Sequence, residues 1–86
     1  MYDRVRYWLS NYGTNGMSDQ RAIQTYMDVE NDELIRSLQN ELIGISSGSS
    51  PEEALAKVLG KNRSVIHGSH MEWARLMLRW MAEYRK

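Results

Sequence analysis

Two histidines, His67 and His70, stand three positions apart toward the C-terminal end of the chain. On a helix this spacing brings two side chains to one face, where the imidazoles could share a metal ion. Zinc prefers four ligands, yet the chain has no Cys and places no suitable third acid beside the pair. We therefore predict no metal site here, and we expect both histidines to lie at the surface or at a helix end.

Four carboxylates within a short stretch resemble half of a cation site: Asp28, Glu30, Asp32 and Glu33. They lack the Gly and the terminal Glu of a calcium-binding loop, so a solvated helix start is the better interpretation. The chain also contains neither a Gly-rich phosphate-binding loop nor a G-x-S-x-G arrangement around a serine. The sequence therefore predicts a protein that is not an enzyme and that uses no cofactor.

Basic and polar residues gather between positions 57 and 67, in a pattern that suits a DNA contact. Lysines can neutralise phosphates, while side chains at the start of a helix can reach base edges in the major groove. The segment from 50 to 70 resembles a DNA-binding helix-turn-helix, and this resemblance implies that Lys57 and Lys61 lie near phosphates and that Asn62 or Ser64 caps the helix that meets the bases. The full set predicted to bind nucleic acid is Lys57, Lys61, Asn62, Arg63, Ser64, Val65 and His67.

The segment from 50 to 70, SPEEALAKVLGKNRSVIHGSH, resembles the helix-turn-helix of the tryptophan repressor, the replication initiator DnaA, region 4 of sigma factors and small phage antiterminators. That motif has a small residue inside its first helix and a residue tolerant of positive φ in its turn, matched by Ala56 and Gly60. Its aliphatic anchors are matched by Leu55, Leu59 and Ile66. The resemblance implies a small regulatory protein, phage or plasmid encoded, that binds duplex DNA. It also implies a homodimer whose two copies contact each other through the first or last helix.

Some positions depart from this pattern. Lys61 follows the turn Gly where an apolar residue is usual, and Ser69 or His70 stands where a further aliphatic anchor is expected. Moreover, a small residue, a Gly turn and an aliphatic anchor occur at any tight corner between packed helices. The alternative function is a helical protein-interaction module, such as an inhibitor, an immunity protein or an adaptor. Its acidic first half, or an exposed Tyr7, would then contact the partner.

The charges are unevenly distributed, although the formal net charge is zero. Residues 1–53 carry nine acids against four bases, a balance of −5, and residues 54–86 carry two acids against seven bases, a balance of +5. Such an asymmetry is typical of a basic binding segment carried on an acidic support.

Apolar spacing and capping residues predict three helices in the first half of the chain. The first ends at Gly13, a residue that favours helix termination. Ser18 and Asn31 are good N-caps for the second and third helices, and the second is expected to end near Asp28. The tract from 44 to 50, GISSGSS, is predicted to be a flexible connection.

Two further signals organise the second half. Ser50 at the N-cap, Pro51 at the first helical position and Glu53 two positions later form a capping box, and Gly60 is expected to end the helix that they begin. The segment from 70 to 85 has the cleanest helical periodicity and is predicted to be a core helix.

These patterns together predict one all-α domain over residues 1–86, a compact orthogonal bundle of four to five helices. An acidic helical support (1–49) precedes the helix-turn-helix-like unit (50–70) and the C-terminal core helix (70–85). Trp, Tyr and Met must fill the core, since the chain has no Phe. The amphipathic start MYDRVRYWLSNY suits neither a signal peptide nor a membrane span, and with the absence of Cys it favours a cytoplasmic protein.

Overall fold

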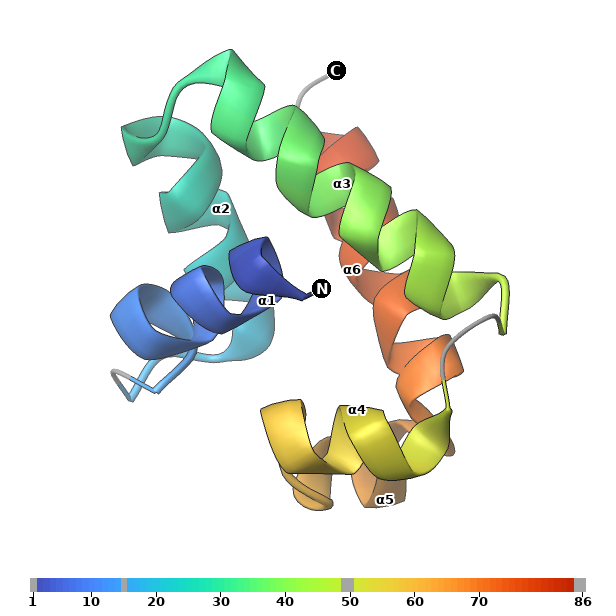
Figure 1. The fold of residues 1–86 in the computed structure, drawn as a ribbon. Coiled ribbons are helices and arrows are strands. Elements are labelled where there is room, and N and C mark those ends of the chain that lie inside the picture. The colour runs from blue at the N-terminus through green and yellow to red at the C-terminus, as the bar shows by residue number, and fades with distance from the viewer. Residues whose placement is uncertain (1, 15, 49–50, 85–86) are drawn as a thin grey trace.

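The computed structural model describes residues 2–14, 16–48 and 51–84, which form helices joined by short turns (Figure 1). In chain order the elements are α1 (Asp3–Trp8), the π-helical turn η1 (Leu9–Gly13), α2 (Asp19–Val29), α3 (Asp32–Ser46), α4 (Glu52–Leu59), α5 (Asn62–His67) and α6 (His70–Tyr84). The described residues contain no strand, which confirms the all-α prediction. They contain six α-helices where four or five were expected.

The core is formed by the long helices α3 and α6 together with α1 and α2, which pack against them. Trp8 and Trp73 meet at its centre, with 5.9 Å between their ring centroids. The prediction that the last helix is a core helix is therefore confirmed, and α2 contributes Ala22, Ile23, Tyr26 and Met27 to the same core.

The beginning of α1 is stabilised from a distant part of the chain. Tyr2 precedes the helix in the left-handed conformation, at φ 63°, and offers no side-chain cap. Instead the Glu41 carboxylate on α3 accepts the backbone N–H groups of Arg4, at 2.9 Å, and Val5, at 3.0 Å. A carboxylate at this end also complements the helix dipole, so Glu41 fastens α1 to α3.

Three predicted helix boundaries are confirmed. Ser18 Oγ accepts the N–H of Arg21 at 3.2 Å, and Asn31 Oδ1 accepts that of Leu34 at 2.9 Å. Gly60 ends α4 at φ 81°, a conformation that suits glycine.

The structure differs from two other expectations about helix ends. The prediction that Pro51 is the first helical residue is wrong, because Pro51 occupies the N-cap and α4 begins at Glu52; the predicted capping residue Ser50 lies outside the described residues. The tract from 44 to 50 is not a loop from its first residue, because α3 continues through Ser46. Ile45 explains this extension: it is the last buried member of the apolar stripe of α3, so its burial favours another helical turn.

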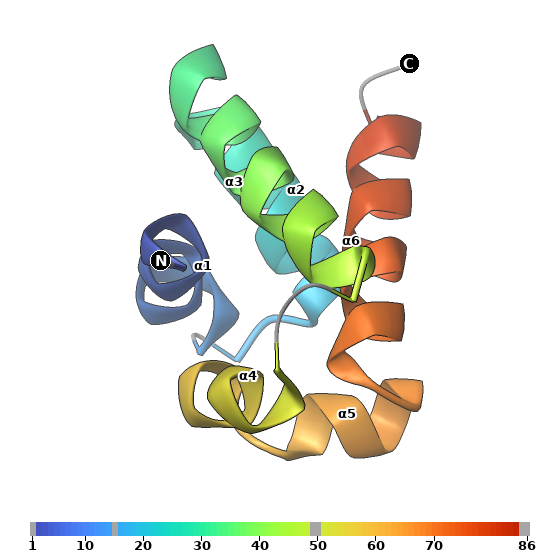
Figure 2. The ribbon, with the colours of Figure 1, turned by 45° about the vertical axis from the view of Figure 1, so that its right-hand side comes forward.

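The α4 and α5 helices form one end of the molecule, and the turn between α2 and α3 forms the opposite end (Figures 1 and 2). The principal extents of the molecule are 30, 26 and 22 Å. No helix among the described residues has the length and apolar character needed to cross a membrane.

Candidate interaction surface around α5

The residues predicted to bind nucleic acid do not all reach the surface. Lys57, Lys61, Asn62 and Val65 are exposed, whereas Arg63, Ser64 and His67 are partly buried. The structure therefore divides the predicted set into an outward group and an inward group.

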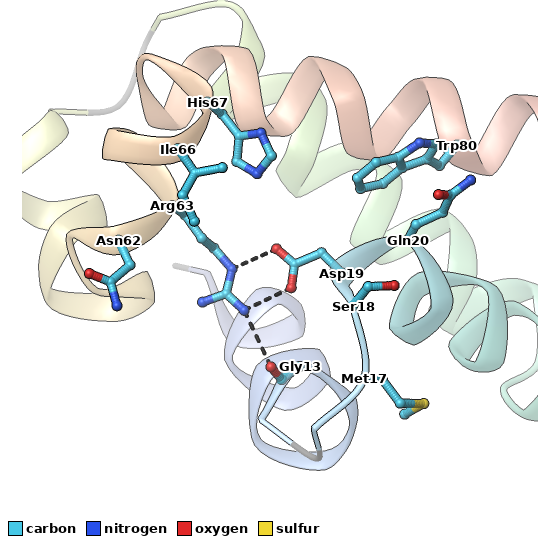
Figure 3. A pocket seen from close by; sticks show the side chains of 10 residues that line it. All are labelled: Gly13, Met17, Ser18, Asp19, Gln20, Asn62, Arg63, Ile66, His67 and Trp80. Carbon is cyan, nitrogen blue, oxygen red and sulfur yellow. Dashed lines mark hydrogen bonds and ion pairs between the residues drawn. The ribbon is translucent and has the colours of Figure 1, made fainter.

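The Arg63 side chain points into the molecule (Figure 3). Its Nε and Nη2 atoms donate to the two carboxylate oxygens of Asp19, at 2.8 and 2.9 Å. Nη1 also donates to the Leu59 carbonyl at 3.1 Å, and Nη2 to the Gly13 carbonyl at 3.3 Å. With 17% of its side chain exposed, Arg63 is committed to these acceptors. Its predicted role at base edges is thus replaced by a structural one.

Two tryptophans complete this network. The guanidinium carbon of Arg63 lies 5.7 Å from the ring centroid of Trp8 and 6.0 Å from that of Trp73, within cation–π range. Trp73 Nε1 donates to Asp19 Oδ2 at 2.9 Å. Arg63 and Asp19 therefore hold α5 and the start of α2 against the aromatic centre of the core.

The outward side of α5 carries two adjacent aliphatic residues. Val65 is 80% exposed and Ile66 is 73% exposed. The prediction that Ile66 is a buried anchor is wrong, because α5 is docked by the inward Arg63 and not by an aliphatic side chain. The α5 helix is also short. It contains only the six residues Asn62–His67 and is followed by Gly68, whose φ of 94° is not helical.

The prediction that Asn62 or Ser64 caps α5 is wrong as well. Lys61 occupies the N-cap of α5, and no side chain caps it. Ser64 instead donates its hydroxyl to the Lys61 carbonyl at 2.8 Å. Asn62 is the first residue of α5 and is exposed, so it lies at the surface without serving as the cap.

A groove of about 490 Å³ runs beside Ile66, between α5, the start of α2 and α6 (Figure 3). Its apolar walls are Met17, Ile66 and Trp80, and the ion pair of Arg63 with Asp19 also lines it. A second hollow, of about 280 Å³, shares His67 with the groove and is lined by Glu72, Arg75, Leu76 and Arg79. The surface therefore continues from an apolar groove to a charged stretch of α6.

The two histidines have different environments, and the expectation of a surface or capping role is wrong for His70. This residue is buried, with Nδ1 bonded to the Glu52 carboxylate and Nε2 lying 3.0 Å from the Gly60 carbonyl. The hydrogen bond from His70 holds the pKa of Glu52 below its ordinary value. His70 thereby joins the start of α6 to both ends of α4. Among the described residues, no three His, Cys, Asp or Glu side chains gather as metal ligands.

Tyr7 was predicted to be an exposed contact, and the structure contradicts this. Its hydroxyl donates to Glu30 Oε2 at 2.8 Å, and that of Tyr12 donates to the same atom at 2.6 Å. The bond to Glu30 raises the pKa of Tyr7, burial raises that of Tyr12, and burial raises the pKa of Tyr26 to about 12. The acidic residue Glu30 is thus an acceptor for tyrosines that fasten α1 and η1 to α2.

Seven residues that line the groove were not foreseen as site residues: Gly13, Met17, Ser18, Asp19, Gln20, Ile66 and Trp80. Trp80 belongs to the segment from 70 to 85 that was predicted to be a core helix. No local signal distinguishes these roles, because the groove is made by segments more than 40 positions apart.

The fold and this surface define a small all-helical protein whose α5 helix exposes the aliphatic residues Val65 and Ile66. No family model, curated protein or solved structure matches the chain. The proposals below accordingly rest on the geometry of this molecule.

Proposed function

We propose that this chain is a helical protein-interaction module that binds a partner protein through the exposed face of α5. The observation that carries the proposal is the exposure of Val65 and Ile66, two aliphatic side chains adjacent in the sequence, of which Ile66 also lines a groove with Met17 and Trp80. Removing one such side chain from water contributes about 1.5–3 kcal/mol, so covering both favours association. A helical protein-interaction module was the alternative function predicted from the sequence. The contact is now assigned to α5 and not to the acidic first half of the chain.

The network beneath α5 supports the proposal because it holds this face in place before binding. Arg63 is fixed by Asp19 and by two backbone carbonyls, and α5 therefore has little freedom to turn its aliphatic residues inward. A preorganised surface loses less conformational entropy on association, so more of the apolar contact appears as affinity.

The proposal is tested by capturing and identifying partners on the immobilised chain. Ile66→Lys is the test variant, and Ile43→Lys is its matched control, because Ile43 is a 53% exposed aliphatic residue on α3. A partner of the α5 face is retained by the wild type and by I43K and is lost from I66K. Equal retention on I66K and the wild type would contradict the assignment of this face.

Duplex DNA binding is the second candidate function, and one observation favours it. Lys57, Lys61 and Asn62 are exposed around the turn between α4 and α5. Lys61→Ala is then expected to reduce the slope of log affinity against log salt by about one, since one phosphate contact is removed. If a DNA column fails to retain the protein below physiological salt, this candidate is excluded.

A further inference from the structure

Another exposed aliphatic residue, Val29, lies at the turn between α2 and α3. Val29 is 66% exposed, and Asp28, Asp32 and Glu33 beside it are exposed as well. We refer to these four residues as the acidic corner. Its composition, one aliphatic side chain surrounded by carboxylates, suits a surface that is apolar at its centre and cationic at its edges.

The face of α5 has that character. Lys61 lies one helical turn before Val65, and the Val65 N–H donates to its carbonyl at 3.2 Å. On the other side, His67 leads to Arg75 and Arg79 in the charged hollow of α6. Lys61 therefore precedes Val65 on one side, and on the other side the groove of Ile66 connects through His67 to a hollow that holds Arg75 and Arg79 together with Glu72.

The arginines on α6 are available to carboxylates from outside. Arg75 pairs with Glu72 and Arg79 with Glu83, but all four side chains are more than half exposed. Exposed pairs of this kind contribute only about 0–1 kcal/mol, so a competing carboxylate can replace the internal one at small cost.

The acidic corner and the α5 face lie at opposite ends of the molecule (Figures 1 and 2). One molecule cannot bring its own two ends together, but two copies can join end to end. Because the two surfaces differ, such a contact leaves one surface of each kind unoccupied and can add further copies as a chain or a closed ring.

We propose that the partner of the α5 face is the acidic corner of a second copy of this chain. Val29 of one copy packs against Val65 and Ile66 of the next, and Asp32 and Glu33 face Lys61, Arg75 and Arg79, while the Asp28 carboxylate accepts the Tyr84 hydroxyl of its own copy. This inference rests on the proposed function, because it requires the α5 face to bind a protein.

The test uses two variants that each damage one end. Ile66→Asp removes the α5 face and leaves the acidic corner, and Val29→Lys does the reverse. Both positions are largely exposed, so the fold is expected to survive, as circular dichroism will verify. Sedimentation velocity is then measured against protein concentration, with Ile43→Asp as the control for an added surface charge.

We expect wild type and I43D to associate with rising concentration, and each end variant to weaken association at least about tenfold. An equimolar mixture of I66D and V29K is expected to form a heterodimer and nothing larger, since one intact surface of each kind remains. Added salt should weaken the contact.

Three outcomes would overturn the inference. If wild type stays monomeric at high concentration, the partner of the α5 face is not a second copy. The proposed function is then still tested separately by the capture experiment on I66K. If V29K associates as wild type does, the contact joins two α5 faces. If the mixed variants form no heterodimer, the two ends do not pair.

Discussion

Arg63 and Asp19 stand 44 positions apart in the chain, and they form a two-point ion pair with N–O distances of 2.8 and 2.9 Å between two tryptophans. This pair connects the short helix α5 to the start of α2 and to the centre of the core. It explains how a six-residue helix with no buried residue keeps a defined position.

Removing Arg63 is expected to lower stability. Arg63→Ala leaves Asp19 partly buried with only Trp73 as a side-chain donor, and breaking a buried pair costs about 3 kcal/mol. The measurement is the free energy of unfolding from urea denaturation. Lys61→Ala is the control, and we expect it to change that free energy by no more than about 0.5 kcal/mol. If R63A is as stable as K61A, the pair does not support the fold.

Acid is expected to destabilise the protein partly through Glu52. The hydrogen bond from His70 lowers the pKa of this carboxyl from its ordinary value of 4.5. A lowered pKa in the folded state adds stability above the ordinary value, and this contribution disappears as the pH falls through the lowered one. Unfolding free energies measured from neutral pH to strong acid should therefore fall less steeply for Glu52→Gln than for wild type. Glu53→Gln, at an exposed neighbour, should follow the wild type, and identical slopes for all three would refute the role of Glu52.

Alkali is expected to act through the tyrosines around Glu30. Burial raises the pKa of Tyr26 from 10.0 to about 12, and the Glu30 bond raises that of Tyr7. A raised tyrosine pKa adds stability that is complete below 10.0 and is lost as the pH rises above it. Spectrophotometric titration should show late tyrosinate formation in wild type. In Glu30→Gln the ionisation of Tyr7 should shift toward lower pH, and an unchanged titration curve would disprove this assignment.

Glu41 is expected to contribute to stability as a cap supplied by another helix. Glu41→Ala leaves the N–H groups of Arg4 and Val5 without their carboxylate and should cost about 1 kcal/mol. Thermal or urea unfolding measures this loss. Asn40→Ala, at an exposed neighbouring site on α3, is the control and should not lower stability, because Ala favours a helix more than Asn does. A loss of equal size in both variants would show that capping is not responsible.

The helices themselves followed from local signals in the sequence. Ser18 and Asn31 cap their helices as expected, and Gly60 ends α4, because capping bonds and backbone conformation involve residues within about one turn. Periodicity likewise identified α6 as a core helix, since an apolar stripe must be buried against something.

The tertiary structure alone decided what the side chains around α5 do. From the sequence, Arg63 was expected to reach outward and Ile66 to be buried, and in the structure each does the opposite. His70 was expected at the surface or at a helix end, and it is the buried first residue of α6. Their positions depend on Asp19, Glu52 and the tryptophans, which lie far away along the chain and meet them only after folding. A local pattern specifies which residues form a helix, whereas the partners that surround that helix determine which of its sides faces the solvent.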